Sequence, residues 1–188
     1  MKLGYAVCGS FCTVPVSMGI LEKLTVAGHT VVPIISYNAG KTDTRFGTAE
    51  DVRRKVVTLC GRQIVDTLTE AEPLGPKEPL DALLICPCTG NTLAKMASGI
   101  TDTPVTLAAK AHLRADRPLI IALASNDAMS ANLGNIGTLL NRKNIYFVPM
   151  RQDDPVRKPH SLVFDADLVP EALENAMMGR QMYPLFLS

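Results

Sequence analysis

A short run of small hydrogen-bonding residues directly follows a fully apolar segment. Residues 83–86 are Leu-Leu-Ile-Cys, and residues 87–92 are Pro-Cys-Thr-Gly-Asn-Thr. A strand that is apolar on both faces is typical of the middle of a covered parallel sheet. In open α/β sheets, ligands bind at the carboxyl ends of the strands, where strand gives way to helix. The run holds hydroxyl and amide groups without a strong base or a set of metal ligands, so it indicates the binding of a polar cofactor.

Polar residues also close three other predicted strands, in short segments that contain Gly9, Ser10, Phe11, Ser36, Ser125 and Asn126. The carboxyl ends of parallel strands lie at one edge of the sheet, so these segments and residues 87–92 are expected to converge. The turn at Gly9 and Ser10 also opens a predicted helix, where free N–H groups and the helix dipole favour an anion. It lacks the three glycines of a dinucleotide fingerprint and the lysine of a P-loop. By itself it fits an ordinary helix cap equally well.

Strands and helices alternate along the whole chain. We expect strands at residues 2–8, 30–36, 83–86, 119–124 and 145–149. Helices are expected to begin near Pro15 and to cover residues 48–68, 93–100, 102–114, 131–142 and 168–178. This alternation predicts an α/β fold, a three-layer doubly wound parallel sheet in one domain spanning residues 1–188.

Three further details follow from the sequence. Pro33 places the second strand at a sheet edge, because proline cannot donate to a central ladder. Residues 150–160 are charged and hold two prolines, so we expect a loop there. The apolar tail at residues 183–187 is expected to dock on a neighbouring surface, since exposed apolar patches are a liability.

Composition excludes several classes of function. The net charge is +1, which gives no electrostatic reason to expect nucleic acid or an anionic membrane as partner. No apolar run reaches about 18 residues, and the first residues lack the apolar region of a signal peptide. The five cysteines form no zinc motif, and Cys86 and Cys88 are too close for a redox CxxC pair. We therefore expect a cytoplasmic protein without a metal site.

Together these motifs resemble the flavoprotein family of flavin-dependent cysteine decarboxylases and flavin prenyltransferases. Gly9 and Ser10 match its first phosphate-proximal loop, residues 87–92 resemble its Pro-Ala-Ser-Ala-Asn-Thr motif, and residues 94–102 match the following helix. Residues 123–129 resemble Pro-x-Met-Asn-x-x-Met but have lost the proline and the first methionine. The resemblance covers about residues 3–150.

The resemblance implies a flavodoxin- or Rossmann-like flavoprotein fold, bound FMN and a homo-oligomer, a trimer or a multiple of it. The implied FMN-binding residues are Gly9, Ser10, Phe11, Ser36, Pro87, Cys88, Thr89, Asn91, Thr92 and Ser125. The implied substrate-binding residues are Asn126 and Met129, and no catalytic residue is implied.

Within the family, residues 4–13, 87–92 and 126–129 most resemble one component of a two-component oxidoreductase from spore-forming bacteria. That resemblance implies an NADP-binding partner chain and the oxidation of a cyclic dihydro-dicarboxylate to its aromatic product in the mother cell. Dehydrogenation needs a hydride acceptor that side chains cannot supply and a flavin or nicotinamide can. The two substrate carboxylates need hydrogen-bond donors, and the candidates are Asn91, Asn126 and one of Lys41, Arg45 or Arg151. The sequence reveals no proton acceptor.

Two alternatives remain, a stand-alone flavin enzyme and a non-catalytic scaffold for the partner. The decarboxylases use a histidine after the second strand, and residues 37–50 contain none. The prenyltransferases carry an arginine near the fourth-strand loop, where this chain has Ser125 and Asn126. A structural or surface role is expected for His29 and His112, and His160 lies in a predicted loop that can fold over the site. The scaffold interpretation predicts a pocket filled by Phe11, Tyr37 or Met129.

Overall fold

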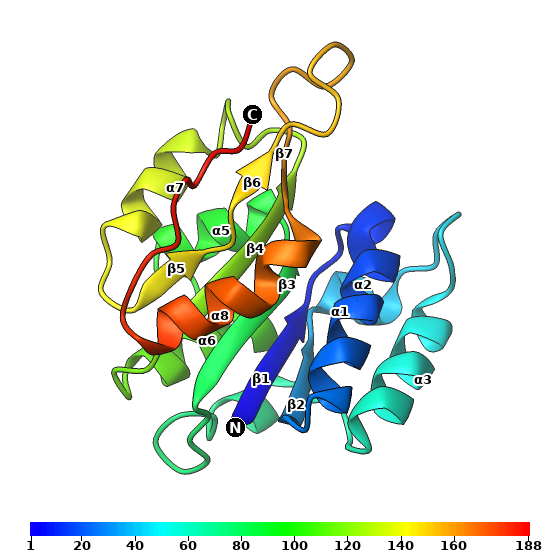
Figure 1. Cartoon of the computed structure of the whole chain (residues 1–188). Helices are drawn as coiled ribbons and strands as arrows, with labels where there is room; N and C mark the ends of the chain where they lie inside the picture. The colour runs from blue at the N-terminus through cyan, green and yellow to red at the C-terminus, as the bar shows by residue number, and fades with distance from the viewer.

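The computed structural model describes residues 1–188 and contains one mixed sheet with helices on both faces (Figure 1). The strand order is β2-β1-β3-β4-β7-β6, and β5 also pairs with β4. The strands are β1 (Lys2–Val7), β2 (Thr30–Ile35), β3 (Ala82–Cys88), β4 (Leu119–Ser125), β5 (Ile145–Phe147), β6 (Met150–Arg151) and β7 (Leu162–Phe164). β1 to β5 pair in parallel, and β2 is an edge strand as Pro33 predicted.

Eight α-helices cover the sheet. They are α1 (Val14–Val26), α2 (Tyr37–Lys41), α3 (Ala49–Cys60), α4 (Leu68–Ala71), α5 (Gly90–Ala97), α6 (Pro104–Leu113), α7 (Leu133–Leu140) and α8 (Val169–Met177). Two short 3-10 helices, η1 (Phe11–Thr13) and η2 (Ala166–Leu168), precede α1 and α8. None of these helices has the length and apolar character that crossing a membrane requires.

Alternate residues of the central strands enter two separate cores. Leu83 and Ile85 pack with α5, α6 and α7, whereas Leu84 and Cys86 pack with α1 and α8 on the opposite face. All four side chains are completely buried. The apolar segment at residues 83–86 is thus a central strand covered on both faces, which confirms the three-layer α/β prediction.

The sheet is not entirely parallel, which corrects the sequence-based prediction. The expected loop at residues 150–160 begins instead with a strand, because Met150 and Arg151 form β6, which pairs with β7 in antiparallel fashion. β5 pairs only with the first half of β4, and β7 takes the second half at Ala124 and Ser125. Strands of two and three residues are too short to show the period-2 alternation by which a strand is recognised.

The helix predicted over residues 48–68 ends at Cys60. Gly61 adopts the left-handed conformation with φ of 61°, which stops the helix. Val65 then pairs with Ile34 along the outer side of β2. The C-terminal tail docks as predicted, because Leu187 N–H donates to Met150 and Met150 N–H donates to Leu185. Leu185 is only 7% exposed.

Candidate functional site

A polar cavity of about 370 Å³ lies at the carboxyl edge of the sheet, beyond the ends of β1, β2 and β3. Its volume falls in the range of about 300–1,000 Å³ that is typical of small-molecule sites. The lining residues are Gly9, Ser36, Tyr37, Asn38, Thr89, Asn91, Thr92, Lys95, Asp102 and Thr103. Five of the predicted cofactor-binding residues therefore face one cavity: Gly9, Ser36, Thr89, Asn91 and Thr92.

Two helix starts shape this cavity. The Ser36 hydroxyl accepts a hydrogen bond from Ala39 N–H at 3.3 Å and caps α2, and the Thr89 hydroxyl accepts from Thr92 N–H at 3.2 Å and caps α5. Capping by serine and threonine fixes where each helix begins. Gly9 allows the β1 loop to come close to α2, since a side chain there would lie 3.3 Å from Asn38 Cβ.

Several donors at the cavity have no partner within the chain. The side-chain amides of Asn38 and Asn91 are exposed and make no hydrogen bond; the Ser10 hydroxyl beside Gly9 is also unpaired, but Ser10 is not among the lining residues. The N–H groups of Gly90 and Asn91 lie in the first turn of α5, where a helix leaves its donors unpaired. These groups suit a ligand with anionic or carbonyl oxygens.

The hydroxyls of Thr89 and Thr92 are used internally. Thr89 Oγ1 donates to Thr92 Oγ1 at 3.1 Å, and Thr92 Oγ1 donates to Cys8 Sγ at 3.4 Å. Burial raises the pKa of the Cys8 thiol to about 11, with the Thr92 hydrogen bond opposing that shift. A thiol with such a pKa stays protonated at neutral pH, so Cys8 is a poor nucleophile.

Lys95 is the only cation that lines the cavity, and it is already paired. Its ammonium group donates to both carboxylate oxygens of Asp102, at 2.9 and 2.8 Å. The hydrogen bond from Lys95 lowers the pKa of Asp102, so this carboxyl is ionised at neutral pH. The helix expected over residues 102–114 begins after Asp102, because Thr103 caps α6. The cavity therefore offers neutral donors and an internally balanced ion pair.

Other predicted residues lie outside the cavity lining. Pro87 and Cys88 are buried in β3, and burial raises the pKa of Cys88 well above the ordinary thiol value, which makes it unreactive. Phe11 lines a separate small apolar hollow with Phe46. Met129 packs against the core, and its N–H donates to the His160 carbonyl at 2.9 Å.

The end of β4 carries a network that the sequence did not predict. Ser125 Oγ donates to the Asp127 carboxylate, and Asn132 Nδ2 donates to the other Asp127 oxygen at 2.9 Å. The neighbouring Asn126 is exposed, and its side chain makes no hydrogen bond within the chain. Ser125 thus binds Asp127, while Asn126 is available to a ligand.

Four further lining residues were not predicted from the sequence, namely Asn38, Lys95, Asp102 and Thr103, and Tyr37 was predicted only as a residue that would fill the pocket. Tyr37 and Asn38 follow Ser36 in a polar stretch without helical periodicity, yet this stretch forms α2. Their place directly after a strand end was the available signal.

The three basic candidates for carboxylate binding differ in their surroundings. Arg151 forms an ion pair with Asp165 and is therefore occupied. The Lys41 ammonium lies 5.1 Å from the ring centroid of Tyr37, and the Arg45 guanidinium lies 4.8 Å from that of Phe46. Neither Lys41 nor Arg45 pairs with an acid.

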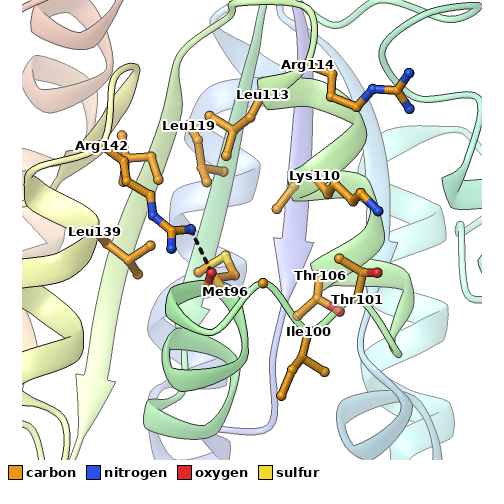
Figure 2. A pocket seen from close by; sticks show the side chains of 13 residues that line it. Met96, Ile100, Thr101, Thr106, Lys110, Leu113, Arg114, Leu119, Leu139 and Arg142 are labelled. Carbon is orange, nitrogen blue, oxygen red and sulfur yellow. Dashed lines mark hydrogen bonds between the residues drawn. The ribbon is translucent and has the colours of Figure 1, made fainter.

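A second hollow of about 340 Å³ lies at the opposite edge of the sheet, at the carboxyl ends of α5, α6 and α7 (Figure 2). Its wall is mostly apolar, and Arg142 reaches across it to donate to the carbonyls of Met96 and Ala97 at 3.0 and 2.6 Å. Figure 2 shows the Arg114 guanidinium extending away from Leu119 and Leu139. This hollow lacks the converging free donors of the cavity at the carboxyl edge.

Comparison with known proteins agrees with this geometry. The model of the family described as Flavoprotein matches residues 1–166. The B subunit of dipicolinate synthase from Bacillus subtilis (strain 168) is 40% identical over 186 residues, which cover 99% of this chain and 93% of that protein. The crystal structure of the corresponding dipicolinate synthase B subunit from Bacillus halodurans is 39% identical with a TM-score of 0.91, over 100% of this chain and 96% of that chain.

A more distant structure shares the fold. The FMN-dependent cysteine decarboxylase SpaF is 22% identical with a TM-score of 0.70, over 95% of both chains. The family model covers most of the chain, and the relative from Bacillus subtilis is similar along nearly its whole length. This chain therefore belongs to the flavoprotein family.

Proposed function

We propose that the chain binds FMN in the cavity at the carboxyl edge and serves as the B subunit of dipicolinate synthase. In this role it acts with an NADP-binding A subunit to oxidise dihydrodipicolinate to dipicolinate during sporulation, in the cytoplasm of the mother cell. The observation that carries the proposal is the convergence of Gly9, Ser36, Thr89 and Asn91 on one open cavity. The similarity to the B subunits of dipicolinate synthase from two Bacillus species supports the choice of enzyme.

The residues present fit a flavin mononucleotide. Ser10, Asn91 and the free N–H groups at the start of α5 can hold the phosphate without a cation. Tyr37 is the only aromatic side chain in the lining and offers a flat surface for a ring. When bound, FMN supplies a two-electron acceptor, which is the chemistry that the side chains lack.

Asn126 and Arg45 are the proposed contacts for the two substrate carboxylates. The Asn126 amide is exposed at the end of β4 and has no partner within the chain. Arg45 keeps its charge unpaired beside Phe46, and an arginine fork matches a carboxylate in geometry. Met129 is the proposed apolar neighbour of the substrate. NADP is proposed to bind on the A subunit.

The alternatives receive less support. No histidine lines the cavity, which disfavours a decarboxylase that needs this base. The scaffold interpretation predicted a filled pocket, whereas Phe11 and Met129 lie outside the lining and Tyr37 leaves the cavity open.

The first test is the visible absorption spectrum of the purified chain, followed by titration with FMN. We expect flavin bands or micromolar FMN binding that weakens at least tenfold in Ser10→Ala and Asn91→Ala. Ser98→Ala is the matched control, because Ser98 lies at the far end of α5 and its side chain makes no hydrogen bond. Absence of flavin and of binding would contradict the proposed site.

The second test adds the partner. Mixed with the A subunit and dihydrodipicolinate, the FMN-loaded chain should support formation of dipicolinate, and neither protein alone should do so. Light scattering should give a trimer or a multiple of it. Full activity of the A subunit without this chain would overturn the proposed role.

A further inference from the structure

A line of hydrogen bonds runs from α7 to the end of β4 and fixes the carboxylate of Asp127. Asn135 Nδ2 donates to Asn132 Oδ1 at 3.0 Å, and Asn132 Nδ2 donates to Asp127 Oδ2 at 2.9 Å. Ser125 Oγ donates to Asp127 Oδ1. Asn132 is only 5% exposed, whereas Asp127 is exposed to solvent. A buried amide thus orients an accessible carboxylate.

Gly90 brings this carboxylate to the first turn of α5. A Cβ atom on Gly90 would lie 2.5 Å from Ser125 Oγ, 2.6 Å from Asn132 Nδ2 and 2.8 Å from Asp127 Oδ1. The residues on either side of Gly90, Thr89 and Asn91, line the candidate cavity. The absence of a side chain at Gly90 therefore places Asp127 against the helix turn whose neighbouring residues line the cavity, while Asp127 itself is not a lining residue.

The surroundings of Asp127 suit a proton acceptor. Both carboxylate oxygens accept a hydrogen bond, and these bonds hold the carboxylate in one orientation. No lysine, arginine or histidine forms an ion pair with Asp127, so its charge is not neutralised. His160 is the titratable residue whose main chain is bonded to this turn, because its carbonyl accepts from Met129 N–H at 2.9 Å.

We propose that Asp127 is the proton acceptor for oxidation of the dihydropyridine dicarboxylate, and that Asn132 is its positioning residue. This inference rests on the proposed function and names the base that the sequence did not reveal. One ring carbon loses a hydride to an oxidised flavin or nicotinamide. The neighbouring ring carbon loses a proton to the Asp127 carboxylate, and the electron pair of that C–H bond becomes the new ring double bond. Asp127 then releases the proton to water, which its exposure permits.

Asp127→Asn is the informative variant, because it keeps the shape and one acceptor oxygen. Measured with the A subunit, its kcat should fall by about 10²- to 10⁴-fold, the usual contribution of general acid–base catalysis. FMN affinity and KM should stay within about threefold of wild type. The acid limb of the wild-type kcat/KM profile should disappear in this variant, and His160→Gln should retain it.

Asn132→Ala tests positioning. It should lower kcat less than Asp127→Asn while FMN affinity stays within about threefold of wild type, because the carboxylate remains and loses only the amide that orients it. Asp116→Asn is the control for removal of an exposed carboxylate, since Asp116 pairs only with Lys143 and Asn144. It should leave kcat, KM and FMN binding unchanged.

A binding measurement gives a readout that does not depend on turnover. Dipicolinate is a dianion, so it should bind the FMN-loaded chain with proton uptake on Asp127, and calorimetry in two buffers detects that proton. Asp127→Asn should bind dipicolinate without proton uptake.

Three outcomes would overturn the inference. Wild-type kcat in Asp127→Asn excludes the proton acceptor while leaving the proposed function intact. If FMN affinity and kcat fall by the same factor, the hydrogen bonds of Asp127 only stabilise the first turn of α5. A wild-type chain that binds FMN and supports no turnover with the A subunit overturns the proposed function and this inference together.

Discussion

The ammonium group of Lys95 and the carboxylate of Asp102 form a two-bonded ion pair inside the lining of the candidate cavity, with N–O distances of 2.9 and 2.8 Å. Lys95 comes from α5 and Asp102 precedes α6, so the pair also joins these two helices. Lys95, the only cation that lines the cavity, is therefore already paired and does not face a ligand as a free charge. An FMN phosphate in this cavity would be bound mainly by neutral N–H and amide donors.

Releasing Lys95 should strengthen the binding of a phosphate-bearing ligand. In Asp102→Asn the ammonium group loses its counter-charge, and we expect FMN to bind several-fold more tightly at low salt. The gain should shrink at high salt, since salt screens exposed charges. FMN titrations of both proteins at two ionic strengths measure this, with Asp116→Asn as control. Weaker binding by Asp102→Asn would show that the pair is needed to shape the cavity.

Gly90→Ala should disrupt the contact between α5 and the end of β4. The added methyl would lie under 3.0 Å from three polar atoms of Ser125, Asp127 and Asn132. Overpacking of this kind costs about 1–3 kcal/mol of unfolding free energy. The matched variant is Gly134→Ala in α7, where nothing lies within 4 Å of the new methyl. That variant should gain about 0.5–1 kcal/mol from helix propensity. Urea unfolding of both proteins compares them, and equal stabilities would contradict the close contact.

The central sheet was predictable from the sequence because burial on both faces leaves a long apolar run. Residues 83–86 and 119–124 carry that signal, and both lie in central strands. Thr48 also begins its helix as expected, since its hydroxyl accepts from Asp51 N–H at 3.1 Å. These features depend on local periodicity and capping, which adjacent residues encode.

The rest depends on contacts that local periodicity does not encode. β7 exists because β5 ends at Phe147 and leaves the second half of β4 without a neighbour, which no local pattern reveals. Asp102 and Thr103 are both reasonable caps, and the choice of Thr103 leaves Asp102 for Lys95, seven residues earlier. The Asp127 network likewise needs Asn132, the residue directly before α7, to lie within hydrogen-bond distance of Asp127.

Arg142 should contribute measurably to stability although it lines the open hollow at the carboxyl ends of α5, α6 and α7. Its guanidinium donates to the carbonyls of Met96 and Ala97 at the end of α5, and the Met96 carbonyl also accepts from Gly99 N–H at 3.2 Å. Hydrogen bonds to a charged group contribute about 1.5–3 kcal/mol. We therefore expect Arg142→Ala to lose an amount in that range in urea unfolding. Arg62→Ala serves as control, because Arg62 is exposed and forms no ion pair or hydrogen bond. A loss below about 0.5 kcal/mol, the usual size of a surface effect, would contradict this role.

His112 should make the fold sensitive to mild acid. The imidazole is fully buried in α6, its Nε2 lies 2.9 Å from the Pro118 carbonyl, and its Nδ1 has no partner. Burial lowers the pKa of His112 below its ordinary value of 6.5. As pH falls through 6.5, the unfolded chain takes up a proton that the folded chain refuses, so stability decreases from there down to the lowered pKa.

The urea midpoint should accordingly fall between pH 7 and 5, and the fall should be smaller in His112→Gln. His29→Gln is the comparison, since burial lowers the pKa of His29 as well, and that residue is only partly buried. It should flatten the profile less than His112→Gln does. If His112→Gln and wild type lose stability equally over this range, His112 is not the buried group that resists protonation.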